Sequence, residues 1–368
     1  MTTGTLRPGT GNTLTDVAGL RVGHATEIGD GALTGTTVVV GPPAGMVAGV
    51  DVRGGGPGTR ETDLLAPTAS VERITAITLT GGSAYGLAAA DGAATALADR
   101  GFGLAVGAAP GEVVPLVPAA VIFDLGRGGR FRATPGAATG RAAVDDALDG
   151  TGTPVPMDGC VGAGTGALAG GLKGGIGSAS VVLPDGTVLA ALVVVNAMGS
   201  PVDVRSGELL GARLLLAGDR ADPGGLPSGE ELATLLAAAQ PRHPVDLLGA
   251  GPGSADAAAV SNTTIGVVAT DATLTKAQCT KLAAVAHDGL ARTLDPVHTQ
   301  FDGDTLFGVS TELRPAPDPV AFHDLLCSAA DVVGRAVVRA VLAATAVSTP
   351  GGAWSGYADL APPAGGPR

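Results

Sequence analysis

Short apolar runs separated by glycine-rich breaks recur along the whole chain. Residues 34–40 and 74–79 are rich in β-branched side chains, and residues 188–195 form an uninterrupted apolar run. The first two patterns predict strands, and the third predicts a buried strand. Two more apolar runs, at residues 265–270 and 305–311, predict strands in the last third of the chain.

Helices are expected between and after these strands. Ser83 can cap an alanine-rich helix that ends at about residue 99, and Thr275 can cap a second helix that ends at about residue 292. A third, longer helix is expected from about residue 319 to residue 347. Because strands alternate with helices, the pattern predicts a layered α/β fold whose sheet faces are covered by helices.

Two stretches rich in glycine, proline and polar residues interrupt the periodic segments. Residues 126–158 are predicted to be loop-like. Residues 218–261, apart from a short helix at 230–239, are the best candidate for a linker. A linker of this kind is exposed, and an exposed segment tolerates a break in the chain.

Composition favours a compact globule with closely packed layers. Hydrophobic residues make up 45% of the 368 residues and charged residues 15%, so the chain can bury a sizeable core as one large domain or several smaller ones. The 60 glycines have no fixed period, which excludes collagen and indicates many tight turns. Aromatic residues are only 2%, so the core must consist mainly of Ala, Val and Leu.

Charge and cysteine usage exclude several classes of protein. With a net charge of −12 and no basic stripe, nucleic-acid binding is not expected. The three cysteines are far apart and form no CxxC, which fits a reducing cytoplasm. The first 16 residues lack the apolar core of a secretory signal. Arg335 and Arg339 interrupt the apolar run at 332–347, which predicts an amphipathic helix rather than a membrane span.

The most informative feature is the tetrapeptide Asn262-Thr263-Thr264-Ile265 at the start of a predicted strand. Cleavage of the bond before Thr263 would give this residue a free amine beside its hydroxyl, and therefore a nucleophile and a base in one residue. The reference pKa of such an amine is about 7.7–8.0, which suits proton transfer near neutral pH. The alternative is that both threonines simply begin the strand, for which Thr has a high propensity.

Asp302 and Asp304 are the candidate partners of Thr263. In an extended segment two residues apart share a face, so both carboxylates can orient the hydroxyl and the amine. Two other interpretations remain at this stage. The Asp-Gly-Asp sequence is also typical of a solvent-exposed turn, and a calcium loop is possible in principle, although the other ligand positions are missing.

Two further polar residues interrupt apolar or glycine-rich surroundings. Asn196 ends the apolar run 188–195, where its amide can donate to an oxyanion or serve as a turn residue. Lys173 is the one charge in a glycine-dense stretch, and it is either a site residue or a lysine in a surface loop. The sequence Gly81-Gly82-Ser83 lacks a full phosphate-binding fingerprint, and the histidines lack metal-binding spacing.

Taken together, these residues resemble the self-processing peptidase family of L-aminopeptidase/D-amidase–esterases, β-peptidyl aminopeptidases and 6-aminohexanoate-oligomer (nylon-oligomer) endohydrolases. The threonine nucleophile with Asp-Gly-Asp is more similar to the nylon-oligomer branch. The resemblance runs along nearly the whole chain. It is carried by the segments 14–24, 79–87, 117–124, 162–166, 171–177, 193–196, 262–265 and 302–307.

This resemblance implies an α/β fold, a four-layer αββα sandwich that is similar to the N-terminal-nucleophile hydrolases but has the family's own distinct topology. It implies one catalytic unit over residues 1–368, cleaved at Asn262–Thr263 into an α chain, 1–262, and a β chain, 263–368. It also implies a homo-oligomer, a tetramer of processed protomers. In the expected site Thr263 is the nucleophile, and Asp302 and Asp304 are the acidic pair that orients it. Asn196 supplies the oxyanion-side amide, Lys173 is the site lysine, and Tyr85 and Phe123 line the substrate pocket. Some members have a tyrosine where this chain has Phe123, whose ring cannot donate a hydrogen bond.

The sequence therefore predicts a cytoplasmic amide hydrolase that processes itself, needs no cofactor or metal, and binds neither nucleic acid nor membrane. Its expected substrates are small peptides or ω-amino-acid oligomers. Two alternatives stay open. One is an aminopeptidase acting strictly on free N-termini, and the other is an uncleaved binding protein with a vestigial site.

Overall fold

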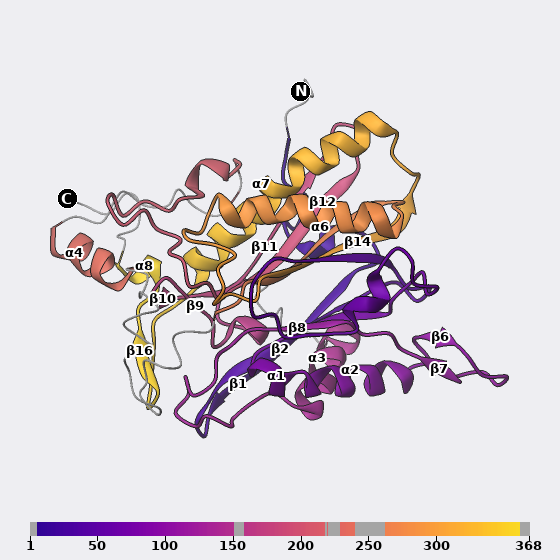
Figure 1. Ribbon diagram of the computed structural model, residues 1–368, viewed down its shortest axis with the longest axis horizontal. Coiled ribbons are helices and arrows are strands. Elements are labelled where there is room, and N and C mark those ends of the chain that lie inside the picture. The colour runs from indigo at the N-terminus through magenta and orange to yellow at the C-terminus, as the bar shows by residue number, and fades with distance from the viewer. Residues whose placement is uncertain (1–5, 151–157, 218, 220–228, 240–261, 361–368) are drawn as a thin grey trace.

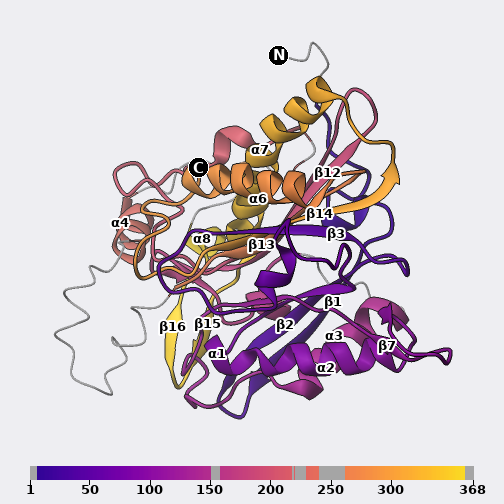
Figure 2. The ribbon, with the colours of Figure 1, turned by 45° about the vertical axis from the view of Figure 1, so that its right-hand side comes forward.

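The predicted alternation of strands and helices folds into four layers, two sheets packed face to face with a pair of helices on each outer face (Figures 1 and 2). The computed structural model describes residues 6–150, 158–217, 219, 229–239 and 262–360. The αββα sandwich implied by the resemblance is confirmed. Apart from residues 219 and 229–239, the predicted linker at 218–261 lies outside the described residues.

The first sheet has the strand order β1-β2-β5-β8-β4, and helices α2 and α3 cover it. Its strands are antiparallel except for the parallel pair β5 and β8. The elements are β1 (Arg21–Gly29), β2 (Ala32–Val40), β4 (Thr59–Arg60), β5 (Ala76–Thr80), β8 (Ala119–Val121), α2 (Ala88–Ala98) and α3 (Ala137–Asp149).

The second sheet has the order β11-β12-β13-β14-β3, and helices α6 and α7 cover it. Strands β13 and β14 are parallel neighbours at its centre, and the other pairs are antiparallel. The elements are β3 (Val47–Val52), β11 (Gly175–Val182), β12 (Val188–Val195), β13 (Ile265–Ala272), β14 (Thr305–Arg314), α6 (Lys276–Ala291) and α7 (Pro319–Ala343).

Shorter elements connect and flank these layers. The short helices and 3₁₀ turns are α1 (Ser83–Gly86), α4 (Gly229–Ala238), α8 (Tyr357–Leu360), η1 (Leu14–Asp16), η2 (Thr62–Leu65), η3 (Gly162–Gly164) and η4 (Ala212–Leu214). The two-stranded ribbons are β6 (Leu104–Ala105) with β7 (Val113–Val114), β9 (Leu168–Ala169) with β10 (Leu172–Lys173), and β15 (Val347–Thr349) with β16 (Gly352–Trp354).

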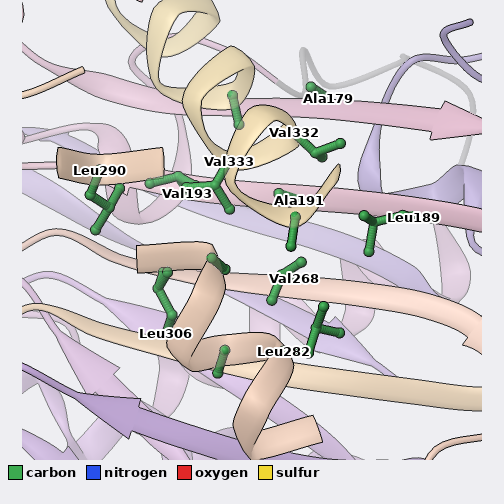
Figure 3. Packing of buried hydrophobic residues seen from close by; sticks show 14 of the residues in the cluster. Ala179, Leu189, Ala191, Val193, Val268, Leu282, Leu290, Leu306, Val332 and Val333 are labelled. Atoms are coloured by element: carbon green, nitrogen blue, oxygen red, sulfur yellow. The ribbon is translucent and has the colours of Figure 1, made fainter. Parts of the chain in front are cut away.

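Strand β12 explains why its sequence is an unbroken apolar run. Leu189, Ala191 and Val193 point to the layer of α6 and α7, where Figure 3 shows them beside side chains such as Val268 and Val333. The alternate residues, such as Leu192, point to the first sheet. Because successive side chains of a strand point to opposite faces, a central strand between two layers must be apolar on both faces.

Small residues allow these layers to approach closely. A Cβ at Gly177 of β11 would lie 2.1 Å from the carbonyl oxygen of Ala336 in α7. A Cβ at Gly308 of β14 would lie 2.1 Å from the carbonyl oxygen of Cys279 in α6. The helix backbones thus rest directly on the sheet at these points, as the scarcity of large side chains predicts.

Most predicted elements are confirmed, with boundary shifts of a few residues. Thr275 caps α6 as expected, with its side chain accepting from the N–H of Gln278. Ser83 does not cap its helix, because Gly82 takes the N-cap position and the helix breaks at Leu87 into α1 and α2. The long last helix ends at Ala343, and the chain then enters β15.

The loop predicted at 126–158 is wrong over residues 137–149, which form α3. Gly140 was part of the loop-like composition, but it lies in the helix where α3 meets α2. A Cβ there would lie 1.8 Å from the carbonyl oxygen of Ala89. Within the described residues, no helix is both long and apolar enough to cross a bilayer, and α7 carries the two arginines noted above.

Candidate active site

Thr263 lies immediately before strand β13, at the end of the sheet where β12 finishes. Val194 pairs with Ile265, so the next residue along β12 past its end, Asn196, comes opposite Thr263. The N–H of Thr263 donates to the backbone carbonyl of Asn196 at 2.5 Å. Its hydroxyl donates to the carbonyl of Asn262 at 2.6 Å. The side chain is buried and directed at the bond that the sequence marks for cleavage.

The parallel pairing of β13 and β14 brings the Asp-Gly-Asp segment beside Thr263. Ile265 pairs with Thr305, and just outside the strands Asn262 bridges to Asp302. The N–H of Gly303 donates to the carbonyl of Asn262 at 3.1 Å. The same carbonyl therefore accepts from the Thr263 hydroxyl and from a backbone N–H. A backbone N–H in this position can stabilise negative charge on that oxygen if the carbonyl carbon is attacked.

Both aspartates are buried, 2% exposed for Asp302 and 1% for Asp304, so the solvent-exposed turn is excluded. Asp304 Oδ1 accepts from the N–H of Thr264 at 2.7 Å. Asp302 accepts from the hydroxyl of Thr299 at 2.6 Å and from the N–H of Met198 at 3.3 Å. These contacts are made by hydrogen-bond donors, which is the environment of a positioned carboxylate rather than of a calcium ligand.

Asp302 has a raised pKa. Burial is the main cause, and the nearby charge of Asp304 adds to it. A carboxylate whose pKa is raised is a better proton acceptor once ionised than an exposed one. Neither aspartate forms a hydrogen bond to the Thr263 hydroxyl in this conformation, where that hydroxyl is bonded to the Asn262 carbonyl. The acidic pair is therefore linked to Thr263 indirectly. Gly303, the residue between the two aspartates, donates its N–H to the Asn262 carbonyl that also accepts from the Thr263 hydroxyl.

The side chain of Asn196 is held by a buried arginine. Its Oδ1 accepts from Arg127 Nη1 at 2.5 Å and from the N–H of Leu168 at 3.0 Å. Its Nδ2 donates to the backbone carbonyl of Phe123 at 3.3 Å. The amide predicted to face an oxyanion is thus bonded to Phe123 in this conformation, and the backbone donor to the Asn262 carbonyl is the N–H of Gly303.

Arg127 is a residue of the site for which the sequence alone predicts no role. It also reaches Asn262 Oδ1 at 3.4 Å, so one guanidinium contacts residues on both sides of the Thr263 N–H. Burial lowers its pKa to about 10, which still leaves it charged at neutral pH. The residue lies in a stretch rich in Gly and Arg that resembles any surface loop, so no spacing or periodicity could have identified it.

Lys173 is fully buried, so the surface-loop interpretation is excluded. Its ammonium donates to the carbonyls of Ala167 at 2.8 Å, Gly174 at 2.7 Å and Gly164 at 3.3 Å. Burial lowers its pKa to about 8. Lys173 contacts the site through the segment 164–168, whose Leu168 N–H holds Asn196, and not through Thr263 itself.

The two predicted pocket residues lie on the side of the first sheet. Phe123 follows β8 and is joined to the site by its carbonyl, which accepts from Asn196. Tyr85 in α1 is 48% exposed, and the Arg132 guanidinium stacks over its ring at 4.3 Å. Asp124 connects these parts, since its carboxylate accepts from the N–H of Gly82 at 2.7 Å, just before α1.

His298 is the second residue of the site for which the sequence alone predicts no role. Its Nδ1 lies 2.7 Å from Asp304 Oδ2, and its N–H donates to the same oxygen at 3.1 Å. A histidine close before an acidic pair in a predicted turn is the one signal that could have identified it. Without a metal-like spacing it carried no weight.

Comparison with known proteins agrees with this geometry. The sequence profile of peptidase family S58 matches residues 12–354. The chain is 43% identical to an uncharacterised aminopeptidase of Mycobacterium leprae over 360 residues, 92% of each protein. It is 33% identical to a 6-aminohexanoate-oligomer endohydrolase of Kocuria sp., over 81% of this chain and 74% of that enzyme.

Solved structures show the same fold. The β-aminopeptidase of Burkholderia sp. has a TM-score of 0.68 and 25% identity, covering 97% of this chain and 94% of that chain. The L-aminopeptidase D-Ala-esterase/amidase of Ochrobactrum anthropi, a variant of the Ntn hydrolase fold, has a TM-score of 0.66 and 21% identity, covering 96% and 93%. Because the family match spans most of its length, this chain belongs to peptidase family S58.

Proposed function

We propose that this chain cleaves its own Asn262–Thr263 bond and then hydrolyses amide bonds in small peptides or ω-amino-acid oligomers with Thr263 as the nucleophile. Membership of family S58 makes it an amide-bond hydrolase of the peptidase class. The observation that carries the finer proposal is the double contact on one carbonyl. The Asn262 oxygen accepts from the Thr263 hydroxyl at 2.6 Å and from Gly303 N–H at 3.1 Å.

Self-cleavage needs two steps at this carbonyl. Thr263 Oγ1 attacks the Asn262 carbonyl carbon, the oxyanion is stabilised by Gly303 N–H, and the hydroxyl proton passes to the adjacent Thr263 nitrogen. The C–N bond then breaks, which leaves an ester between Asn262 and the Thr263 oxygen. Water hydrolyses that ester, giving a carboxylate on Asn262 and a free amine and hydroxyl on Thr263.

The new amine has a ready position. As the peptide N–H, it already donates to the Asn196 carbonyl at 2.5 Å, and an amine can keep this hydrogen bond. One carbonyl would therefore fix the nitrogen that takes the proton from the hydroxyl. In turnover, Thr263 Oγ1 attacks the substrate carbonyl, the amine passes its proton to the leaving nitrogen, and water hydrolyses the acyl-enzyme.

The proposal is tested by following the chain from synthesis in a cell-free translation system on denaturing gels. Wild type should give two fragments, and the smaller should begin Thr-Thr-Ile-Gly by N-terminal sequencing. Thr263→Ala should remain one chain, whereas Thr263→Ser, which keeps a hydroxyl, should still cleave. A wild-type protein that stays intact while it hydrolyses amides would refute the mechanism.

A second candidate activity is strict aminopeptidase action. It is favoured by the relative with 43% identity, which is named an aminopeptidase, whereas the endohydrolase is 33% identical. Free and N-acetylated 6-aminohexanoate trimers, together with amino-acid p-nitroanilides, distinguish the two. An endohydrolase cleaves the acetylated trimer, but an aminopeptidase requires the free amine. Thr263→Ala is the control for background hydrolysis in each assay.

A further inference from the structure

Both carboxylate oxygens of Asp304 form hydrogen bonds, and the partner of one oxygen is His298. Oδ1 accepts from the N–H of Thr264 at 2.7 Å, while Oδ2 is 2.7 Å from His298 Nδ1 and 3.1 Å from its backbone N. The carboxylate is 1% exposed, so water does not compete for these bonds at the surface. Because both oxygens of Asp304 already accept from backbone N–H groups, His298 Nδ1 is assigned as the donor to Oδ2.

The backbone of His298 is bent to make this double contact. Its φ is +56°, in the left-handed region that residues with a Cβ seldom adopt. Such a conformation persists where its surroundings hold it in place, and it is frequent at functional sites. Here it directs both the backbone N–H and the ring of one residue at the same oxygen of Asp304.

A second histidine supports the ring from behind. His287 in α6 lies edge-on to His298, with ring centroids 4.8 Å apart, and its Nε2 lies 3.0 Å from the carbonyl of Asp51 in β3. Burial is the main reason that the pKa of His287 is lowered to about 4, so its ring is neutral near pH 7. Among the described residues, Asp304 is the one hydrogen-bond partner of the His298 side chain, since His298 Nε2 is buried without another.

This arrangement holds the hydrogen bond between Asp304 and the N–H of Thr264, the residue next to the proposed nucleophile Thr263. Thr264 is outside the β13 ladder, and its N–H is bonded to Asp304 Oδ1. If Asp304 turned, the Thr263–Thr264 peptide would lose that contact and the Thr263 hydroxyl its alignment with Asn262. We propose that His298 is a positioning residue for self-cleavage, which acts by holding Asp304 against the Thr264 N–H. This inference rests on the proposed function.

Asparagine and aspartate at position 298 form a matched pair. Both are nearly the same size, and both tolerate a positive φ better than most residues. The amide nitrogen of asparagine occupies about the place of histidine Nδ1 and can donate to Asp304. The carboxylate of aspartate cannot donate, and its charge opposes that of Asp304. His298→Gly keeps the backbone conformation without any side chain.

The experiment follows self-cleavage of the full chain by time-resolved cell-free translation, with the melting temperature of each purified protein measured in parallel. His298→Asn should cleave within about threefold of the wild-type rate. His298→Asp and His298→Gly should be slower by roughly 100-fold, the loss that a misplacement of about 1 Å can cause.

Two results would overturn the inference. One is an aspartate or glycine variant that folds and cleaves as fast as wild type. The other is an asparagine variant that is as slow as the aspartate variant at an equal melting temperature, because the donor would then have no role. If wild type itself fails to cleave, the proposed function fails instead, and the two failures are therefore distinguishable.

Discussion

Replacement of Gly303 by alanine tests the geometry of the proposed cleavage site most directly. A Cβ at this position would lie 2.7 Å from Thr263 Oγ1 and 2.7 Å from the carbonyl oxygen of Gly56. Ordinary carbon–oxygen contacts begin at about 3.4 Å, so each of these two contacts must lengthen by roughly 0.7 Å. Gly56 belongs to the backbone, whereas Thr263 Oγ1 belongs to a side chain that can rotate about χ1. The hydroxyl is therefore expected to move.

The size of the effect follows from the same distances. A displacement approaching 1 Å at the reacting atom can cost about 10²-fold in rate. The overpacking itself should cost about 1–3 kcal/mol in the free energy of unfolding. Gly303→Ala should therefore fold, retain the N–H donor at residue 303, and cleave roughly 100-fold more slowly than wild type. The assay is the rate at which the intact chain disappears on denaturing gels, with urea unfolding as the stability measurement.

Gly56→Ala is the matched control. A Cβ at Gly56 meets nothing closer than the carbonyl oxygen of Asp302 at 3.9 Å, so it adds the same methyl group to the same region without a clash. This variant should cleave at the wild-type rate. Equal cleavage rates in the Gly303 and Gly56 variants would refute the inference that the Thr263 hydroxyl, in the position described, is the attacking group.

Three further outcomes are expected. Burial lowers the pKa of His24 to about 4, so below pH 6.5 the unfolded chain binds a proton that the folded chain does not. Stability should fall by about 2 kcal/mol between pH 7 and pH 5, and urea titrations of His24→Asn should show a smaller loss. Gly140→Ala should lower the free energy of unfolding by about 1–3 kcal/mol, because α3 must move away from the Ala89 carbonyl; an unchanged urea midpoint would contradict this. Burial raises the pKa of Asp124, and the charge of Arg127 partly offsets this. Arg127→Met removes that charge and should lower the free energy of unfolding by about 3 kcal/mol, with Arg127→Lys intermediate in the same measurement.

The sequence predicted the layers well, because burial leaves a strong pattern. The run at 188–195 is apolar on every residue since β12 lies between two packed layers, and its two faces contribute to two different clusters. The cap of α6 at Thr275 could also be predicted, because it depends on residues close together in the chain. The helix α3 was missed for the opposite reason. Gly140 serves the packing of α3 against α2, a contact between segments far apart, and in sequence it is indistinguishable from a turn residue.

The site divides in the same way. Thr263, Asp302 and Asp304 were predicted, and the structure places them together through the parallel register of β13 and β14. Their assignment as catalytic groups stays a prediction. Arg127 and His298 act through the orientation of a guanidinium and a ring toward partners 69 and 6 residues away, respectively. Spacing and composition do not encode such an orientation. The position of His298 close before the acidic pair is its one signal in the sequence, and Arg127 has none.

The order of the second sheet has a consequence for timing. Strands β13 and β14 come from the segment after residue 262, yet they lie between β12 and β3 from the segment before it. A nascent chain cannot place the Thr263 N–H against the Asn196 carbonyl until β13 has paired with β12 from the earlier segment. Under the proposed function, scission thus reports completed assembly, since a misfolded chain stays whole. The two chains formed by cleavage would stay together, because β13 pairs with β12 and β14 pairs with β3 across the cut. The product would be one folded protein with a second N-terminus and a second C-terminus.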